Sequence, residues 1–211
     1  MGTYRVGILG SFSGKVGTVI GSSWNGINYM RSLPRPSSKA ATEAQLIVRT
    51  KFALAMGFLS PIRPLFEAGY KSAVGQTGAN AATSQIISTI AGPDVQSLAI
   101  TYPQVLISRG SLTGAEGFSA TPGVASVEVE WLDNGTTGNA SPADKAVTLV
   151  YCPALSQYSY DLGGALRSVG TQTITLSPSF TGKTVQVWLG FISADGKKAS
   201  TSVFVGAKLI G

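Results

Sequence analysis

The 211-residue chain contains no histidine. Histidine is the usual general base near neutral pH and the commonest metal ligand, so its absence removes the Ser-His-Asp and Cys-His nucleophile pairs and most metal sites. Other acids and bases are also sparse, because Asp, Glu, Lys and Arg make up only 12% of the residues, against roughly 25% in an average protein. We therefore expect a protein that is not an enzyme, with no catalytic residue, no metal ion, no cofactor and no small-molecule substrate.

Cysteine is nearly absent as well, because Cys152 is the single one. One cysteine can form neither an internal disulfide nor a thiolate metal cluster. Cys152 ends the apolar run AVTLVYC and precedes a proline. This position predicts a buried thiol at the end of a strand rather than a reactive one.

The sequence also lacks segments typical of export or membrane insertion. Its start, MGTYRVGILGSFSGKVG, has neither the charged beginning nor the uninterrupted apolar stretch of a secretory signal. No run approaches the roughly 18 apolar residues of a membrane span. We expect synthesis in the cytoplasm without a signal peptide, and no membrane partner.

The charges that are present are unevenly distributed. Residues 1–72 hold nine Lys or Arg and two Glu, a net charge of +7, whereas residues 73–211 hold seven basic and eight acidic residues, a net charge of −1. A basic first part suggests nucleic acid or an acidic protein as a partner. The basic residues form no run, so solvated faces and internal ion pairs are the more common explanation.

Glycine is abundant, with 26 residues in the chain. Those of the first 26 positions fall at 2, 7, 10, 14, 17, 21 and 26. They punctuate short β-type runs, KVGTVIG and GINYMRS, which predict a hairpin turning around residues 22–25 within a glycine-rich β-arm over residues 1–36. The segment LPRPSS at the end of the arm predicts a stiff, extended linker.

An arm so rich in glycine has little core of its own, and we expect it to pack on a neighbouring subunit or, as the second choice, on the helical segment of its own chain. The candidate assembly contacts are Lys15, Trp24, Tyr29, Arg31 and Arg35. Trp24 and Tyr29 would act as apolar anchors. The alternative is that these aromatic side chains stack on bases beside the cations, as in single-strand nucleic-acid binding.

A helical segment is predicted over residues 37–92. Thr42 and Gln45 form a capping box, with Glu43 in the first turn, and apolar residues then recur at a helical period to about residue 59. The stretch SPIRPLF predicts a turn, because proline disfavours a continuing helix. A second helix is expected from about residue 81 to 90, with Asn80 as its cap.

The pattern changes to strands in residues 93–211. Short β-branched or aromatic runs appear as VQSLAITY, QVLISRG, VASVEVEW, AVTLVYC, TQTITLS, VQVWLGFIS and TSVFVGAKL. The last five are separated by turn signals at a spacing typical of an antiparallel immunoglobulin-like β-sandwich. The expected fold is thus mainly β with a small α part: a glycine-rich β-arm, two helices, and a sandwich that should fold alone.

Several stretches are distinctive as a set: GKVGTVIGSSW in the arm, TEAQ at the helix start, and FISADGKK near the C-terminus. With them the chain resembles, over nearly its whole length, a domain family of unknown function from Bacteroidota and their phages. Asn25 departs from that family, where lysine is expected. The resemblance implies a bacterial or phage origin and a shared architecture, and it implies no catalytic residues.

These observations lead to two functional expectations. The first is a non-enzymatic structural protein that self-assembles or decorates a larger particle, such as a phage capsid, tail or fibre, by arm or strand exchange. Its partners would be further copies of itself or other particle proteins, and its location the virion or particle. The alternative is a binding module whose basic N-terminal half engages nucleic acid or an acidic protein.

Overall fold

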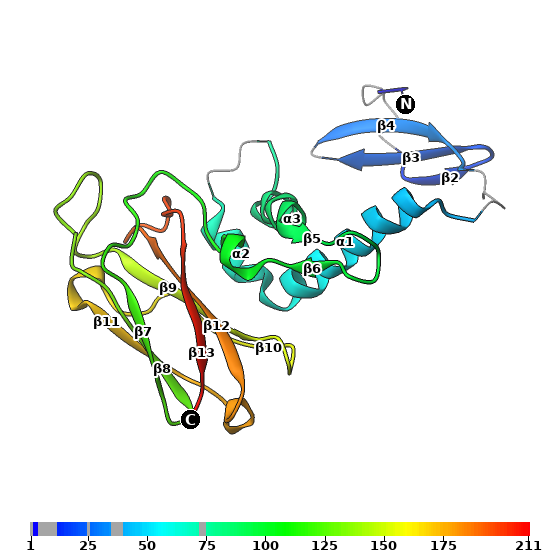
Figure 1. Cartoon of the computed structure of the whole chain (residues 1–211). Helices are drawn as coiled ribbons and strands as arrows, with labels where there is room; N and C mark the ends of the chain where they lie inside the picture. Colours follow the sequence, from blue (N-terminus) through cyan, green and yellow to red (C-terminus); the bar gives the residue numbers. More distant parts are fainter. Residues whose placement is uncertain (1, 4–11, 25, 35–39, 72–74) are drawn as a thin grey trace. The chain divides into compact units, whose positions relative to one another are not determined.

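The computed structural model describes residues 2–3, 12–24, 26–34, 40–71 and 75–211. The chain forms two compact units, Met1–Thr42 and Glu43–Gly211, whose elements are labelled in Figure 1. It is mainly β with a small α part, and all pairings between its strands are antiparallel, which confirms the predicted fold class. The predicted division at residues 36 and 92 stays a prediction. None of the helices that the structure describes is long and apolar enough to cross a membrane.

The first unit is a four-stranded sheet in the order β1-β4-β3-β2. Its strands are β1 (Gly2–Thr3), β2 (Gly14–Val16), β3 (Val19–Trp24) and β4 (Ile27–Ser32). The run KVGTVIG, predicted as one strand, is split in two by a turn at Gly17, which has a φ of +59°. The predicted hairpin turn at residues 22–25 is displaced and lies between Trp24 and Ile27, which pair with each other. Glycine explains both turns, because tight hairpin loops require a positive φ, and Gly26 has a φ of +79°.

The second unit begins with the helices. α1 spans Glu43–Leu59, so it starts directly after the predicted cap at Thr42 and ends where it was expected to end. The prediction of a turn at SPIRPLF is wrong, because the chain continues through η1 (Ser60–Ile62) into α2 (Arg63–Gly69). Each of these elements has a proline in its first turn, where the missing N–H is not needed.

α3 spans Gly78–Thr89 and begins earlier than predicted. Its cap is Thr77, whose hydroxyl accepts a hydrogen bond from the backbone N–H of Asn80 at 3.2 Å. Asn80 therefore lies inside the helix and is not the cap. The chain leaves α3 through a two-stranded ladder of β5 (Ile90–Ala91) and β6 (Ala99–Ile100).

The run QVLISRG was predicted to be a strand, and the structure contradicts this. After η2 (Tyr102–Gln104), residues 105–110 form no strand. Their backbone groups bond to side chains instead: Trp188 Nε1 donates to the Val105 carbonyl at 3.0 Å, and the Ile107 N–H donates to Ser202 Oγ at 2.9 Å. Val105 and Ile107 of this run are buried without a ladder.

The remainder is a seven-stranded sandwich. One sheet has the order β10-β9-β12-β13 and the other β11-β8-β7. Five of these strands were predicted: β8 (Ser126–Glu130), β9 (Lys145–Cys152), β11 (Thr171–Thr175), β12 (Thr184–Ile192) and β13 (Val203–Leu209). The other two, β7 (Ser119–Gly123) and β10 (Gln157–Asp161), were missed. β11 pairs with β8, and β12 pairs with β9. These pairings between strands that do not follow one another in the chain are those of the Greek-key topology of immunoglobulin-like folds.

Two hydrophobic clusters share the sheet that contains β9 and β12. Val150 and Val187 face the interior of the sandwich. Leu149 and Trp188 point to the other face, where they pack with Phe58 and other side chains of the helices. The helices thus cover the outer face of this sheet, and β9 is buried on both sides.

Candidate assembly surface

The first unit carries four of the five predicted contact residues on one face of its sheet. Side chains alternate between the two faces along a strand, and residues paired across strands share a face. Lys15 and Arg31 are both paired with Ile20, one on each side of it. Tyr29 lies two positions from Arg31 on β4, and Trp24 lies four positions from Ile20 on β3. All of them therefore belong to one surface.

Ile20 and Ile27 belong to the same surface but were not among the predicted contacts. Ile27 pairs with Trp24 at the end of the hairpin. Trp24 is 60% exposed and Ile27 is 52% exposed, so this apolar part meets solvent. We call the surface formed by Lys15, Ile20, Trp24, Ile27, Tyr29 and Arg31 the arm face. Arg35, the fifth predicted contact, lies outside the described residues.

The opposite face of the sheet is equally poor in buried contacts. Phe12 packs against Gly21, where an added Cβ would collide with its ring. Val16 remains 64% exposed and Met30 remains 36% exposed. Within the described part of this unit, Gly21 is the one buried residue. The sheet therefore has no hydrophobic core of its own.

The second unit also exposes apolar side chains, on the first half of α1. Val48 is 67% exposed and Phe52 is 52% exposed. They are four residues apart and so lie one above the other on a helix. The second half of the same helix is different, because Ala55, Phe58 and Leu59 are buried.

A cleft of about 540 Å³ lies in the second unit between the helices and the sandwich. Tyr151 and Tyr158 stack there with ring centroids 4.6 Å apart, and the ring of Tyr102 lies 5.6 Å from that of Tyr151. Leu54 and Gly57 of α1 form part of its lining. We call this the tyrosine cleft.

The tyrosine cleft is neutral. Among the described residues that line it, none is charged. Burial raises the pKa of Tyr102 and of Tyr158, and the neighbouring Tyr151 adds to both shifts. The hydroxyl of Tyr158 donates to the carbonyl of Gly57 at 3.4 Å. These phenols stay protonated at physiological pH, and Tyr102 and Tyr158 both bond to Tyr151, so what the cleft offers a ligand is its aromatic faces.

A second, more polar cleft of about 640 Å³ is lined by α3 and the chain around Arg109. Gln85 and Ser88 of α3 contribute to it, together with Tyr70. The Tyr70 hydroxyl donates to the Leu106 carbonyl at 2.9 Å. Burial raises the pKa of Tyr70, and Arg109 opposes that shift. The described residues of its lining include no paired nucleophile and base.

Comparison with known families places this geometry in context. Residues 11–206 match the model of DUF6266, a family of unknown function. The chain belongs to the DUF6266 family. This match confirms that the chain resembles a domain family of unknown function. No curated protein matches the chain.

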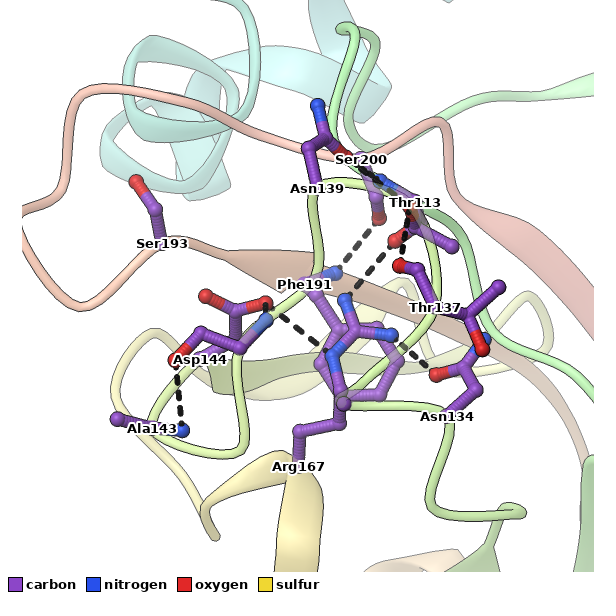
Figure 2. Close-up of polar contacts among 12 residues, drawn as sticks. Thr113, Asn134, Thr137, Asn139, Ala143, Asp144, Arg167, Phe191, Ser193 and Ser200 are labelled. Carbon is purple, nitrogen blue, oxygen red and sulfur yellow. Dashed lines mark hydrogen bonds and ion pairs between the residues drawn. The ribbon is translucent and has the colours of Figure 1, made fainter.

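The DUF6266 sandwich also contains a buried ionic network that the sequence analysis missed (Figure 2). Arg167 is fully buried. Its Nε donates to Asp144 Oδ2 at 3.2 Å, its Nη1 to Asn134 Oδ1 at 2.5 Å, and its Nη2 to the Thr113 carbonyl at 2.9 Å. The guanidinium carbon lies 3.8 Å from the ring centroid of Phe191.

This network is structural. Burial lowers the pKa of Arg167, and the carboxylate of Asp144 opposes that shift. An arginine remains charged in either case. Because its nitrogens already have partners and the side chain has no exposed surface, Arg167 joins the loops at one end of the sandwich and is not available to a ligand.

The remaining DUF6266 side chains offer little further chemistry. In the residues that the structure describes, no group of three or more His, Cys, Asp or Glu could hold a metal ion. Cys152 is free and buried, which confirms its predicted burial at the end of a strand.

Proposed function

We propose that this DUF6266 chain is a non-enzymatic structural protein that self-assembles into, or decorates, a larger particle by exchanging its arm. The partners are further copies of the chain or other particle proteins, and the particle is a phage virion component such as a capsid, tail or fibre. One observation supports the proposal above all: the arm forms a four-stranded sheet, yet only Gly21 of its described residues is buried.

A sheet without a core needs stabilisation from elsewhere. Ordering glycine costs more backbone entropy than ordering any other residue, and isolated hairpins are marginal in water. Burying an aromatic side chain removes roughly 200 Å² from water, worth about 5 kcal/mol. For the exposed 60% of Trp24 this is about 3 kcal/mol. Covering the arm face with a partner would thus offset the cost of ordering the arm.

The phage setting rests on resemblance alone. The distinctive stretches of the chain are similar to those of a domain family from Bacteroidota and their phages. A particle protein needs many copies and extensive contacts, and the exposed apolar residues of the arm face and of α1 suit that demand.

The test is self-association of the full chain. Sedimentation velocity at two concentrations should show an oligomer that Trp24→Ala/Tyr29→Ala, or deletion of residues 1–36, abolishes. Circular dichroism should show that the second unit stays folded in both variants. The matched control is Phe118→Ala/Tyr160→Ala, which removes two aromatic rings, each 38% exposed, from the sandwich. The proposal fails if the arm variants assemble as the unchanged chain does.

Nucleic-acid binding is the second candidate, because the arm face combines cations with aromatic rings. Lys15 and Arg31 flank Ile20 on the surface that also carries Trp24 and Tyr29. Single-strand binding proteins combine stacking platforms with basic side chains in this way. Titration of a labelled single strand at several salt concentrations distinguishes the candidates. Phosphate binding weakens steeply with salt, and Lys15→Ala/Arg31→Ala should then reduce the slope, whereas apolar arm exchange should persist at high salt.

A further inference from the structure

We propose that the tyrosine cleft binds the proline-containing segment LPRP, residues 33–36, of a second copy of the chain. The inference deepens the proposed function and rests on it, because the arm of one copy would deliver this segment to the next. It identifies a receptor site on the second unit that neither the sequence nor the family match indicates.

Gly57 is the first argument. It lies inside α1, where glycine is unfavourable relative to alanine. A Cβ added at Gly57 would meet no atom within 4 Å, so the packing of the chain itself does not require glycine there. Gly57 also lines the tyrosine cleft. A glycine that leaves helix backbone open in a cleft allows another backbone to approach closely.

The chemistry of the lining is the second argument. The cleft presents the rings of Tyr102, Tyr151 and Tyr158 and the apolar side chain of Leu54, and its described lining has no charged side chain. Sugars are usually held by carboxylate, amide or guanidinium side chains, and none of these occurs among the described residues of the lining. Aromatic-lined grooves bind extended proline-rich segments, whose rings pack on the aromatic faces.

The chain itself supplies such a segment. Pro34 and Pro36 are separated by one residue, closer together than any other two prolines in the sequence. The Leu33 N–H donates to the Thr18 carbonyl at 2.8 Å, so the segment leaves directly from the sheet of the arm. Leu33 is 39% exposed. Residues 35–39 lie outside the described structure.

The length of the connection permits an intermolecular contact. Ten residues, 33–42, separate the end of β4 from the start of α1. Fully extended, they span about 35 Å. This is sufficient for an arm held on one copy to present residues 33–36 to its neighbour. Because a polyproline segment is already extended, little conformational entropy is lost when it docks.

The first experiment measures peptide binding to the full chain. A fluorescent peptide with the sequence of residues 32–38, SLPRPSS, should bind, and the matched peptide SLARASS should bind at least tenfold more weakly. Gly57→Leu should weaken binding of SLPRPSS at least tenfold, because the new side chain fills the cleft. Its melting temperature should not fall, since leucine favours a helix and a Cβ there meets nothing. The proposal is overturned if SLPRPSS does not bind, if SLARASS binds equally well, or if Gly57→Leu binds SLPRPSS as tightly as the unchanged chain does.

The second experiment decides whether the segment comes from another copy. Pro34→Ala/Pro36→Ala impairs the segment and Gly57→Leu impairs the cleft, so each variant alone should self-associate less than the unchanged chain. An equal mixture of the two should regain association, because the intact segment of one variant meets the intact cleft of the other. If the mixture regains nothing, or if Gly57→Leu alone associates normally, the second copy is not the occupant. These results leave the Trp24→Ala/Tyr29→Ala test of the proposed function unaffected, because that variant keeps residues 33–36.

Discussion

Removal of Arg167 tests whether the buried network holds the sandwich together. The side chains of Arg167 and Asp144 are 0% and 2% exposed. Arg167→Met keeps much of the side-chain volume but leaves the Asp144 carboxylate buried without its cation. The carboxylate would still accept a hydrogen bond from the Ser141 N–H, at 2.8 Å. Breaking a buried ion pair in this way costs about 3–5 kcal/mol. A domain has only about 5–15 kcal/mol of stability in total, so the loss should be large.

The assay is urea denaturation of the full chain followed by circular dichroism, with the free energy of unfolding extrapolated to water. The free energy of unfolding of Arg167→Lys should lie between those of Arg167→Met and the unchanged chain, because lysine keeps the charge but lacks the planar guanidinium with its several donors. The control is Arg63→Met, since the ion pair of Arg63 with Glu67 is exposed and worth less than about 1 kcal/mol. The reasoning is refuted if Arg167→Met costs no more than Arg63→Met.

Three further changes probe other parts of the second unit. Thr77→Ala should lower the free energy of unfolding by about 1 kcal/mol, because the Asn80 N–H loses its acceptor; a thermal melt identical to that of the unchanged chain would show that this cap contributes nothing. Residues 93–211 expressed alone should aggregate or melt early, since the helices cover one face of the sheet; a monomeric, strand-rich product would contradict this. Alkaline pH should destabilise the chain: the raised pKa values of Tyr102 and Tyr158 keep protons bound in the folded state, so stability holds below about pH 10 and falls above it. The phenolate absorbance of Tyr102 and Tyr158, taken as the difference from Tyr102→Phe/Tyr158→Phe, should therefore rise together with unfolding, not before it.

Local signals predicted the elements that local interactions determine. The capping box at Thr42 located the start of α1, and the alternating pattern located five strands of the sandwich. β7 was missed because its sequence, SATPG, has little of the β-branched character typical of strands. The turn predicted after α1 was wrong because each proline stands at the start of a new helix, which the sequence pattern does not distinguish from a break.

The sites depend on contacts that are distant in sequence, and this limits what the sequence can predict. The arm face needed the strand register before Ile20 and Ile27 could be placed beside Trp24. The partners of Arg167 come from separate loops around Thr113 and Asn134, and no spacing of residues indicates such a network. The expectation of an autonomous sandwich was based on strands alone, and it could not include the helical layer on the outer face of β9.

The sheet that the helices and the sandwich share delays folding of the second unit until late in synthesis. Phe58 lies in α1, and its ring packs edge-on against Trp188, with centroids 6.2 Å apart; 129 residues separate the two in the chain. The ribosome therefore releases the helices long before β12, which carries part of their binding surface. During that interval the apolar faces of α1 and α3 have no sheet to cover, and contacts so distant in sequence form slowly. A nascent chain that stops before β12 should thus be a substrate for chaperones, and completion of β12 should be the step that makes the second unit resistant to proteases.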